Sequence, residues 1–353
     1  MEFKEATDLW KPTGISFGSG GTHVFALLGT LSRLLESGTI DNVMRWYGCS
    51  AGSFCAYLGA LGVTSTWIQE MLVYFDMRIV ENIEEDRLTD FLNCWGINSG
   101  KGMSEFLGRF LDTWEPGAST WTFADLASKR PGVSLNITAT NLTLGSLAVF
   151  SAKTTPTLRI LDAIRASSSV PLIFTPWMDA HGSMYCDGGV LEEYPWSYVE
   201  NKEKTLVVIC SDTAICRRTP TKAVIRTLGE YMGRIFKLCQ QNQCTDIPKY
   251  WIAINNRTVD TLDFKIEPEE RTILFQDGVR AASGWLRFRT KQVPMQETRG
   301  SHPPSGGRYT SSSFPHAPNK TSESHQSRTP PPHPYPSRGL HSGGTRCDRR
   351  WSL

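Results

Sequence analysis

The chain has 353 residues, of which 40% are apolar and 20% are charged, a composition typical of a globular protein with a sizeable core. Its formal net charge of +2 gives no indication of a nucleic-acid partner. The sequence has no long uncharged apolar run and does not begin with a basic and then apolar segment, so we expect neither a membrane-spanning helix nor a secretory signal. The nine cysteines are scattered without a C-x-x-C pair, which predicts reduced thiols in a cytoplasmic protein, with no zinc site and no disulfide framework.

The last part of the chain differs in kind from the rest. Residues 291–353 hold nine Lys or Arg against three Asp or Glu, together with ten of the 20 prolines and five of the seven histidines. Such a segment buries too little apolar area to offset its chain entropy. We therefore predict an N-terminal extension (1–12), one domain (13–288) and a disordered basic tail rich in Pro, Ser and His (289–353). The tail is suited to an anionic surface, or else is a solvated segment without a partner.

The first part of the domain alternates short apolar runs with helical spacing. Thr13–Phe17 is predicted as a strand that ends in a glycine-rich turn, and residues 22–36 as the helix that follows. Val43–Tyr47 is predicted as a second strand, and Phe54–Leu61 as a buried helix because it is apolar almost all round. Residues 65–95 are predicted as further helices.

The second part of the domain continues the alternation. Strands are expected at 133–140, 147–151, 172–174, 184–186 and 206–210, and helices at 158–165, 223–238 and 271–286. Strands that alternate with helices indicate an α/β layered fold with a mainly parallel sheet.

A Gly48-x-Ser50-x-Gly52 motif lies between the second predicted strand and the next helix. A nucleophile elbow occupies this position in a strand–turn–helix unit. The turn is so tight that small residues are needed on both sides, and it projects the serine hydroxyl above the sheet at the positive end of the helix. The alternative is an ordinary tight turn with an inert serine.

A second glycine-rich turn, Gly18-Ser19-Gly20-Gly21-Thr22, follows the first predicted strand. Unpaired backbone N–H groups in such a turn converge on an anion. The turn lacks the endings of the nucleotide-binding fingerprints, and a serine elbow in the next unit favours an oxyanion hole instead. A structural glycine-rich turn remains the alternative.

The base that would activate Ser50 is not an obvious histidine. The domain offers only His23, one turn into the first helix, and His181, in a predicted turn. Asp187-Gly188-Gly189 follows a short strand, and a partly buried carboxylate there has a pKa raised toward the useful range for a general base. A simple turn is the alternative for this tripeptide.

These motifs, in this order, resemble those of the patatin-like phospholipase family. The segment Ala166-Ser167-Ser168-Ser169-Val170-Pro171 is similar to the family's segment before its aspartate, and Asp187-Gly188-Gly189-Val190 is similar to its D-G-G/A block. The resemblance covers roughly residues 13–288. It implies a three-layer α/β sandwich whose mainly parallel sheet is flanked by helices.

The resemblance also implies a mechanism and a substrate class. Ser50 matches the family's nucleophile, Asp187 its base, and Gly20, Gly21 and the N–H of Thr22 its oxyanion loop. The family cleaves acyl esters of phospholipids and neutral acylglycerols without a metal or cofactor, so the implied partners are such lipids and, peripherally, a membrane or lipid-droplet surface.

The chain departs from the family's pattern in two places. The loop that usually has the form G-G-G-x-[RK]-G has Ser19 for the first glycine, His23 for the basic residue and Val24 for the last glycine, and Glu192-Glu193 stands where asparagine is common. These acids are expected to raise the pKa of Asp187 further. Two rival functions remain open: a catalytically weakened lipid- or protein-binding module, and a lipid acyltransferase.

Overall fold

The computed structural model describes residues 10–75, 91–210, 248–255, 259 and 261–291, which all belong to one unit, residues 1–295. The tail predicted to be disordered lies outside the described residues from 292 onward, as do the extension before Trp10 and the helix predicted at 223–238. The division into extension, domain and tail therefore stays a prediction. The last described helix runs to Lys291, three residues beyond the expected domain boundary.

The described strands form one eight-stranded sheet in the order β10-β9-β1-β2-β4-β8-β7, with β5 also paired to β4. The strands β10, β9, β1, β2 and β4 run parallel, whereas β5, β8 and β7 are antiparallel to their neighbours. Their bounds are β1 (Gly14–Phe17), β2 (Arg45–Cys49), β4 (Ser134–Asn141), β5 (Ser146–Ser151), β7 (Trp177–Met178), β8 (Met184–Asp187), β9 (Thr205–Ile209) and β10 (Trp251–Ala253). A separate parallel pair joins β3 (Gly96–Asn98) to β6 (Leu172–Phe174).

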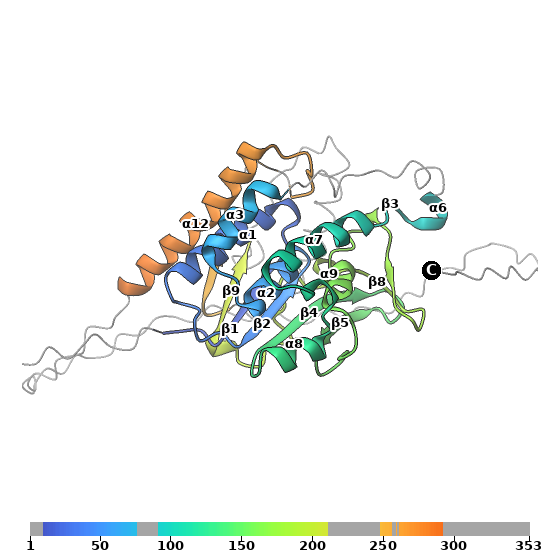
Figure 1. Cartoon of the computed structure of the whole chain (residues 1–353), viewed down its shortest axis with the longest axis horizontal. Coiled ribbons are helices and arrows are strands. Elements are labelled where there is room, and N and C mark those ends of the chain that lie inside the picture. Colours follow the sequence, from blue (N-terminus) through green and yellow to red (C-terminus); the bar gives the residue numbers. More distant parts are fainter. Residues whose placement is uncertain (1–9, 76–90, 211–247, 256–258, 260, 292–353) are drawn as a thin grey trace, which may run out of the picture. The chain divides into compact units, whose positions relative to one another are not determined.

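Helix α2 packs on β2 and its neighbours, α9 packs directly on β4 and β8, and α1, α3 and α12 pack on one another (Figure 1). The helices are α1 (Val24–Glu36), α2 (Ala51–Leu61), α3 (Ser65–Tyr74), α6 (Phe91–Cys94), α7 (Lys101–Trp114), α8 (Phe123–Lys129), α9 (Ile160–Ser167) and α12 (Pro268–Lys291), with 3-10 turns at η1 (Gly21–His23), η2 (Ala118–Thr120), η3 (Gly188–Val190) and η4 (Lys202–Lys204). No helix in the described part of the chain is long and apolar enough to span a bilayer.

The two faces of the sheet bury alternate residues of the same strands, as the pleat requires. In β9, Leu206 and Val208 belong to the main core beneath the helices, whereas Val207 and Ile209 pack on the opposite face. Among the described residues, that opposite face is covered by the segment 194–199. The predicted α/β class, with a mainly parallel sheet flanked by helices, is confirmed.

The longest helix, α12, packs closely along α1 (Figure 1). Glycines make this approach possible: a Cβ at Gly29 would lie 2.0 Å from the carbonyl oxygen of Phe275, and one at Gly278 would lie 1.9 Å from that of Ala26. The hydroxyl of Thr30 donates to the carbonyl of Gly278 across the same contact. The first helix is thereby held so that its N-terminal end stays over the sheet edge.

The sequence located most elements to within a few residues but missed others. The periodicity in 101–114, with apolar side chains such as Met103, Phe106 and Leu107 on one face, is visible in the sequence and yet that helix was not predicted. β3 and α8 were missed as well. Of the apolar residues in α3 and just after it, Ile68, Met71 and Phe75 are buried in the core, Trp67 and Leu72 are half-buried, and Tyr74 is exposed.

Candidate active site

The turn between β2 and α2 holds Ser50 in a left-handed backbone conformation, with φ of 52° and ψ of −127°. Non-glycine residues adopt positive φ only when the surroundings fix it. The flanking glycines supply that tightness: a Cβ at Gly48 would lie 2.5 Å from the Cα of Ser53, and one at Gly52 would lie 2.4 Å from the carbonyl oxygen of Gly18. Ser50 therefore stands at the tip of a sharp elbow at the N-terminus of α2.

The side chain of Ser50 meets that of Asp187. The serine Oγ donates a hydrogen bond of 2.6 Å to Oδ2 of the aspartate, at the end of β8, and both residues are buried. The two are 137 positions apart in the chain, but β2 and β8 pair end to end with the same edge of β4, since β5 occupies its other edge. Cys49 pairs with Thr138 and Asp187 with the next residue, Ala139. The sheet thus brings the two motifs together at one edge.

Hydrogen bonds hold Asp187 in place on both sides. Its Oδ1 accepts from the N–H of Gly189 at 2.8 Å, and its own N–H donates to the carbonyl of Ser169. Its carbonyl accepts from the hydroxyl of Thr140. A Cβ at Gly188 would lie 2.5 Å from the carbonyl oxygen of Thr138, so only glycine allows the turn after the aspartate to lie this close to β4.

Burial raises the pKa of Asp187 to about 6, and the hydrogen bonds from Ser50 and Gly189 act in the opposite direction by stabilising the charged form. The two acids expected to add to this rise, Glu192 and Glu193, are not among its causes, and Oε1 of Glu192 accepts hydrogen bonds from Trp196 and Ser197. The removal of the Asp187 carboxylate from water, and not a neighbouring charge, is therefore the cause of the higher pKa.

Other candidate nucleophiles and bases are accounted for separately. Burial raises the pKa of the Cys49 thiol well above its ordinary value, and the thiol donates to the carbonyl of Glu192 at 3.4 Å. Nε2 of His23 lies 3.0 Å from the carbonyl oxygen of Val259, and His181 is exposed in the turn between β7 and β8. Ser50 is thus the hydroxyl that faces a carboxylate at the elbow.

The glycine-rich turn after β1 lies against both motifs: a Cβ at Gly52 would lie 2.4 Å from the carbonyl oxygen of Gly18, and one at Gly189 would lie 3.1 Å from Oγ of Ser19. Gly21 has a positive φ of 53° and lines the same cavity as Ser50. The N–H of Thr22 donates to the carbonyl of Thr261, so the group assigned to an oxyanion hole from the sequence already has an acceptor here. Within the part of the chain that the structure describes, the N–H groups of Gly20 and Gly21 have none.

Sequence reasoning gave no role to Ser167, which contacts the elbow directly. Its Oγ accepts the backbone N–H of Ser50 at 2.7 Å and donates to the carbonyl of Thr138 at 2.6 Å. Two residues earlier, the buried Arg165 donates to the carbonyls of Ser99 and Thr175. The end of α9 therefore ties the elbow to β4 and fixes the segment that follows it.

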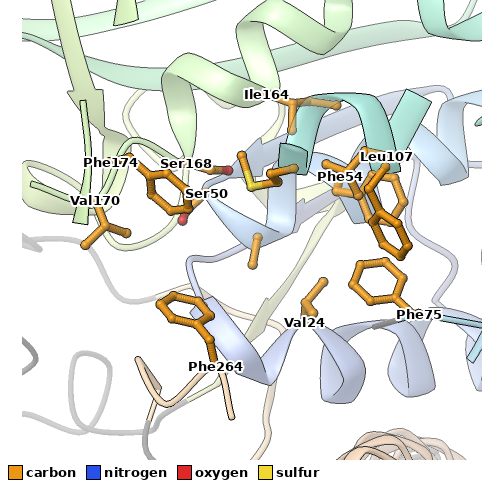
Figure 2. Close-up of a pocket in the computed structure, with 14 residues that line it drawn as sticks. Val24, Ser50, Phe54, Phe75, Leu107, Ile164, Ser168, Val170, Phe174 and Phe264 are labelled. Atoms are coloured by element: carbon orange, nitrogen blue, oxygen red, sulfur yellow. The ribbon is translucent and has the colours of Figure 1, made fainter. Parts of the chain in front are cut away.

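An apolar cavity with an empty volume of about 580 Å³ opens beside Ser50. Figure 2 shows Phe54, Leu107 and Phe75 on the side of the cavity away from Ser50, and Phe174 on the side of the serine. The walls come from α1, α2, α7, α9 and the segment around β6. A long apolar group held there would have its polar end at the Ser50 hydroxyl.

A family model described as "Patatin-like phospholipase" matches residues 15–199, more than half of the chain, and both the elbow and Asp187 fall inside the match. The chain belongs to the patatin-like phospholipase family. Among solved structures, this patatin-like chain is similar to VipD from Legionella pneumophila, with a TM-score of 0.53 and 17% identity over 80% of this chain and 68% of that one. At this identity the likeness shows the fold alone.

Two viral proteins are related to this patatin-like chain in sequence. The uncharacterized protein R571 of Acanthamoeba polyphaga mimivirus is 23% identical over 76% of this chain and 91% of its own length. The probable lipid hydrolase 463L of Invertebrate iridescent virus 6 is 28% identical over 53% of this chain and 65% of its own length.

Proposed function

We propose that the protein is a lipid acyl hydrolase that cleaves fatty-acyl esters with Ser50 as the nucleophile and Asp187 as the general base, without a metal ion. One observation carries the proposal: the Oγ of a serine at a strained elbow donates at 2.6 Å to a buried carboxylate, at the edge of an apolar cavity. A serine hydroxyl needs an adjacent base to become a nucleophile, and this carboxylate is placed to accept its proton.

In the first half of the reaction, Asp187 takes the proton of the Ser50 hydroxyl while Oγ forms a bond to the ester carbonyl carbon. The tetrahedral intermediate then collapses. The bond from carbon to the leaving oxygen breaks, and Asp187 returns the proton to the departing alcohol or lysolipid. The products of this half are the free alcohol and an acyl group bonded to Ser50.

In the second half, a water molecule donates its proton to Asp187 and attacks the acyl carbon. The bond from that carbon to Oγ breaks as the fatty acid leaves, and the proton returns from Asp187 to Ser50. A pKa of about 6 supports both halves, since the carboxylate is ionised at neutral pH and yet basic enough to hold a proton briefly.

The negative charge on the carbonyl oxygen of the intermediate needs donors that are not already used. We assign this role to the N–H groups of Gly20 and Gly21, together with the N-terminus of α2, whose first N–H groups have no partner within the helix. Because the N–H of Thr22 is donated to Thr261, Thr22 contributes by holding the turn in shape.

The substrate class follows from the cavity and the family. The lining of the cavity is almost wholly apolar and suits a fatty-acyl chain; the side chains include Phe54, Phe75, Leu107 and Phe174. The family is described as phospholipases, and one relative is called a probable lipid hydrolase. Phospholipids and acylglycerols are therefore the proposed substrates.

Such lipids reside in aggregates, and two exposed apolar residues support contact with a lipid surface. Trp95 is 51% exposed and Leu172 is 40% exposed, and Leu172 lies between two cavity-lining residues, Val170 and Phe174. Leu172 pairs with Gly96, the neighbour of Trp95, in the small β3–β6 sheet. We call Trp95 and Leu172 the lip, and propose that it touches the lipid surface from which the substrate enters.

The test is fatty-acid release from a panel of phospholipids and triacylglycerols in the presence of a chelator. Release by the wild type and none by purified Ser50→Ala would support the proposal, and equal release by both would overturn it. A fluorophosphonate label on Ser50 separates an enzyme from a binding module with decayed chemistry. The same assay with added lysolipid, in which acyl transfer would give a new diacyl product, separates a hydrolase from an acyltransferase.

A further inference from the structure

The cavity beside Ser50 ends at a cluster of aromatic rings, and a second, more open hollow lies behind that cluster. This second hollow, which we call the groove, is formed by α3 and α7 and has an empty volume of about 1000 Å³. Its apolar lining comes from Trp67, Met71, Tyr74, Phe106 and Phe110. The two hollows are thus neighbours in the same part of the core.

Phe106 is the one described residue that lines both hollows. It is buried, and its ring contacts two others: its centroid is 5.1 Å from that of Phe75, at a right angle, and 4.7 Å from that of Phe110. The rings of Phe75 and Phe110 also stack on each other, with 5.5 Å between their centroids. Phe75 lines the cavity and not the groove, whereas Phe110 lines the groove and not the cavity. The three rings together form the wall between the cavity and the groove, and Phe106 is the member of this wall that faces both.

Helix geometry explains why this wall depends on one side chain. Residues three and four apart lie on the same face of a helix. On α7, Met103 and Leu107 turn toward the cavity, while Phe110 and Thr113 turn toward the groove. Phe106 stands at the boundary of the two faces and contributes to both. A Leu or Ala at this position would leave the boundary without its ring.

We propose that Phe106 determines the longest acyl chain that the enzyme accepts, by closing the end of the cavity. The inference rests on the proposed function, because it takes the cavity as the place where the acyl chain lies. A chain that reaches the ring meets a packed aromatic cluster, which yields only with repacking of Phe75 and Phe110. A chain that passed this point would enter an apolar groove and continue to gain contact area.

The experiment measures kcat/KM of the wild type, Phe106→Ala and Phe106→Leu on p-nitrophenyl esters from butyrate to stearate in detergent micelles. The wild type should pass through a maximum at an intermediate chain length. In Phe106→Ala the maximum should move to longer chains, with the ratio of long- to short-chain kcat/KM rising about fourfold for each additional methylene accommodated. Phe106→Leu, which loses less volume and keeps the core better packed, should give a smaller shift in the same direction.

Tyr74→Ala is the control, since it removes an exposed ring that lines the groove and not the cavity. It should keep the chain-length maximum of the wild type. An unchanged maximum in both Phe106 variants, or an equal shift in Tyr74→Ala, would overturn the proposal. Failure of the wild type to hydrolyse any ester in the series, butyrate included, would instead overturn the proposed function itself.

Discussion

The elbow and the lip both hold large or polar residues at positive φ, but in opposite surroundings. Ser50, with φ of 52°, is buried, and its backbone N–H and side chain are both hydrogen-bonded. Trp95 and Leu172, with φ of 57° and 68°, expose their apolar side chains. The elbow's strain is fixed by contacts within the protein, and it serves to project a hydroxyl. At the lip, the unfavourable backbone conformation leaves apolar side chains exposed to water, which points to a partner outside the chain.

The comparison predicts that changes at the elbow lower turnover, whereas changes at the lip alter the response to the state of the substrate. The largest effect is expected from Ser50→Ala, which removes the nucleophile. Hydrolysis of both monomeric and aggregated esters should fall by about 10⁴-fold or more, measured as kcat. Ser37→Ala, a serine at the far end of α1, is the control and should retain activity. A residual rate near that of the wild type would mean that another group attacks the ester.

The next largest effect is expected from Asp187→Asn, which keeps the shape but cannot take the proton. We expect kcat to fall by about 10³-fold to 10⁴-fold. At neutral pH the same substitution should raise the free energy of unfolding relative to its value at acidic pH. Because the pKa of Asp187 is raised in the folded protein to about 6 from 3.8, its contribution to stability is present below the lower value and is lost as the pH rises through the higher one.

The asparagine side chain is neutral throughout this range and suffers no such loss. The free energy of unfolding of Asp187→Asn, relative to wild type, should therefore rise by about 2.4 kcal/mol between pH values of about 4 and 7. Chemical denaturation at the two pH values measures this difference. A constant difference would show that the carboxylate is not held at a raised pKa.

The same ionisation should appear in the rate. Only the ionised Asp187 accepts the serine proton, so kcat/KM should fall about tenfold for each pH unit below about 6 and level off above it. A soluble monomeric ester is the suitable substrate, since a lipid surface would add its own pH dependence. A plateau that continued unbroken down to the ordinary pKa of an aspartate would contradict the assignment of Asp187 as the base.

A smaller effect is expected at Ser167, which we regard as a positioning residue. Ser167→Ala would leave the N–H of Ser50 and the carbonyl of Thr138 without their present partner, and kcat should fall about tenfold with KM unchanged. Ser167→Thr, which keeps a hydroxyl, should restore part of the loss. Ser169→Ala is the control, because that buried hydroxyl bonds to Arg165. Ser169→Ala should keep the kcat of the wild type. If Ser167→Ala lowers only the melting temperature and leaves kcat unchanged, as Ser169→Ala should, then Ser167 does not position the elbow.

The elbow and Asp187 were accessible to sequence reasoning because each carries its own signature. Gly48-x-Ser50-x-Gly52 and Asp187-Gly188-Gly189 need glycine for close backbone contact, and those glycines are visible in the sequence. Ser167 was not accessible in the same way. It stands in a run of three serines, and only the end of α9 decides which one faces the elbow.

The wall between the cavity and the groove could not be predicted from the sequence, for a different reason. The apolar spacing of residues 101–114 was available as a helix signal, but no periodicity states that Phe106 would meet Phe75 and Phe110 from both sides. Likewise, Thr22 was assigned as a donor from its place in the turn. Its N–H is instead donated to Thr261, more than two hundred positions away, a contact that depends on the tertiary fold.

The smallest predicted effect tests the other half of the comparison, the lip. Asparagine tolerates positive φ, so Trp95→Asn and Leu172→Asn remove the apolar side chains with little cost to the backbone. The ratio of activity on phospholipid vesicles to activity on a monomeric ester should fall about fivefold in the double variant, because less apolar area enters the lipid surface. Tyr198→Asn is the control: this residue is 47% exposed and belongs to the segment 194–199 on the opposite face of the sheet, so its replacement should leave that ratio unchanged. An equal loss of activity on vesicles and on the monomeric ester would instead mean that the lip, like the elbow, supports the catalytic geometry.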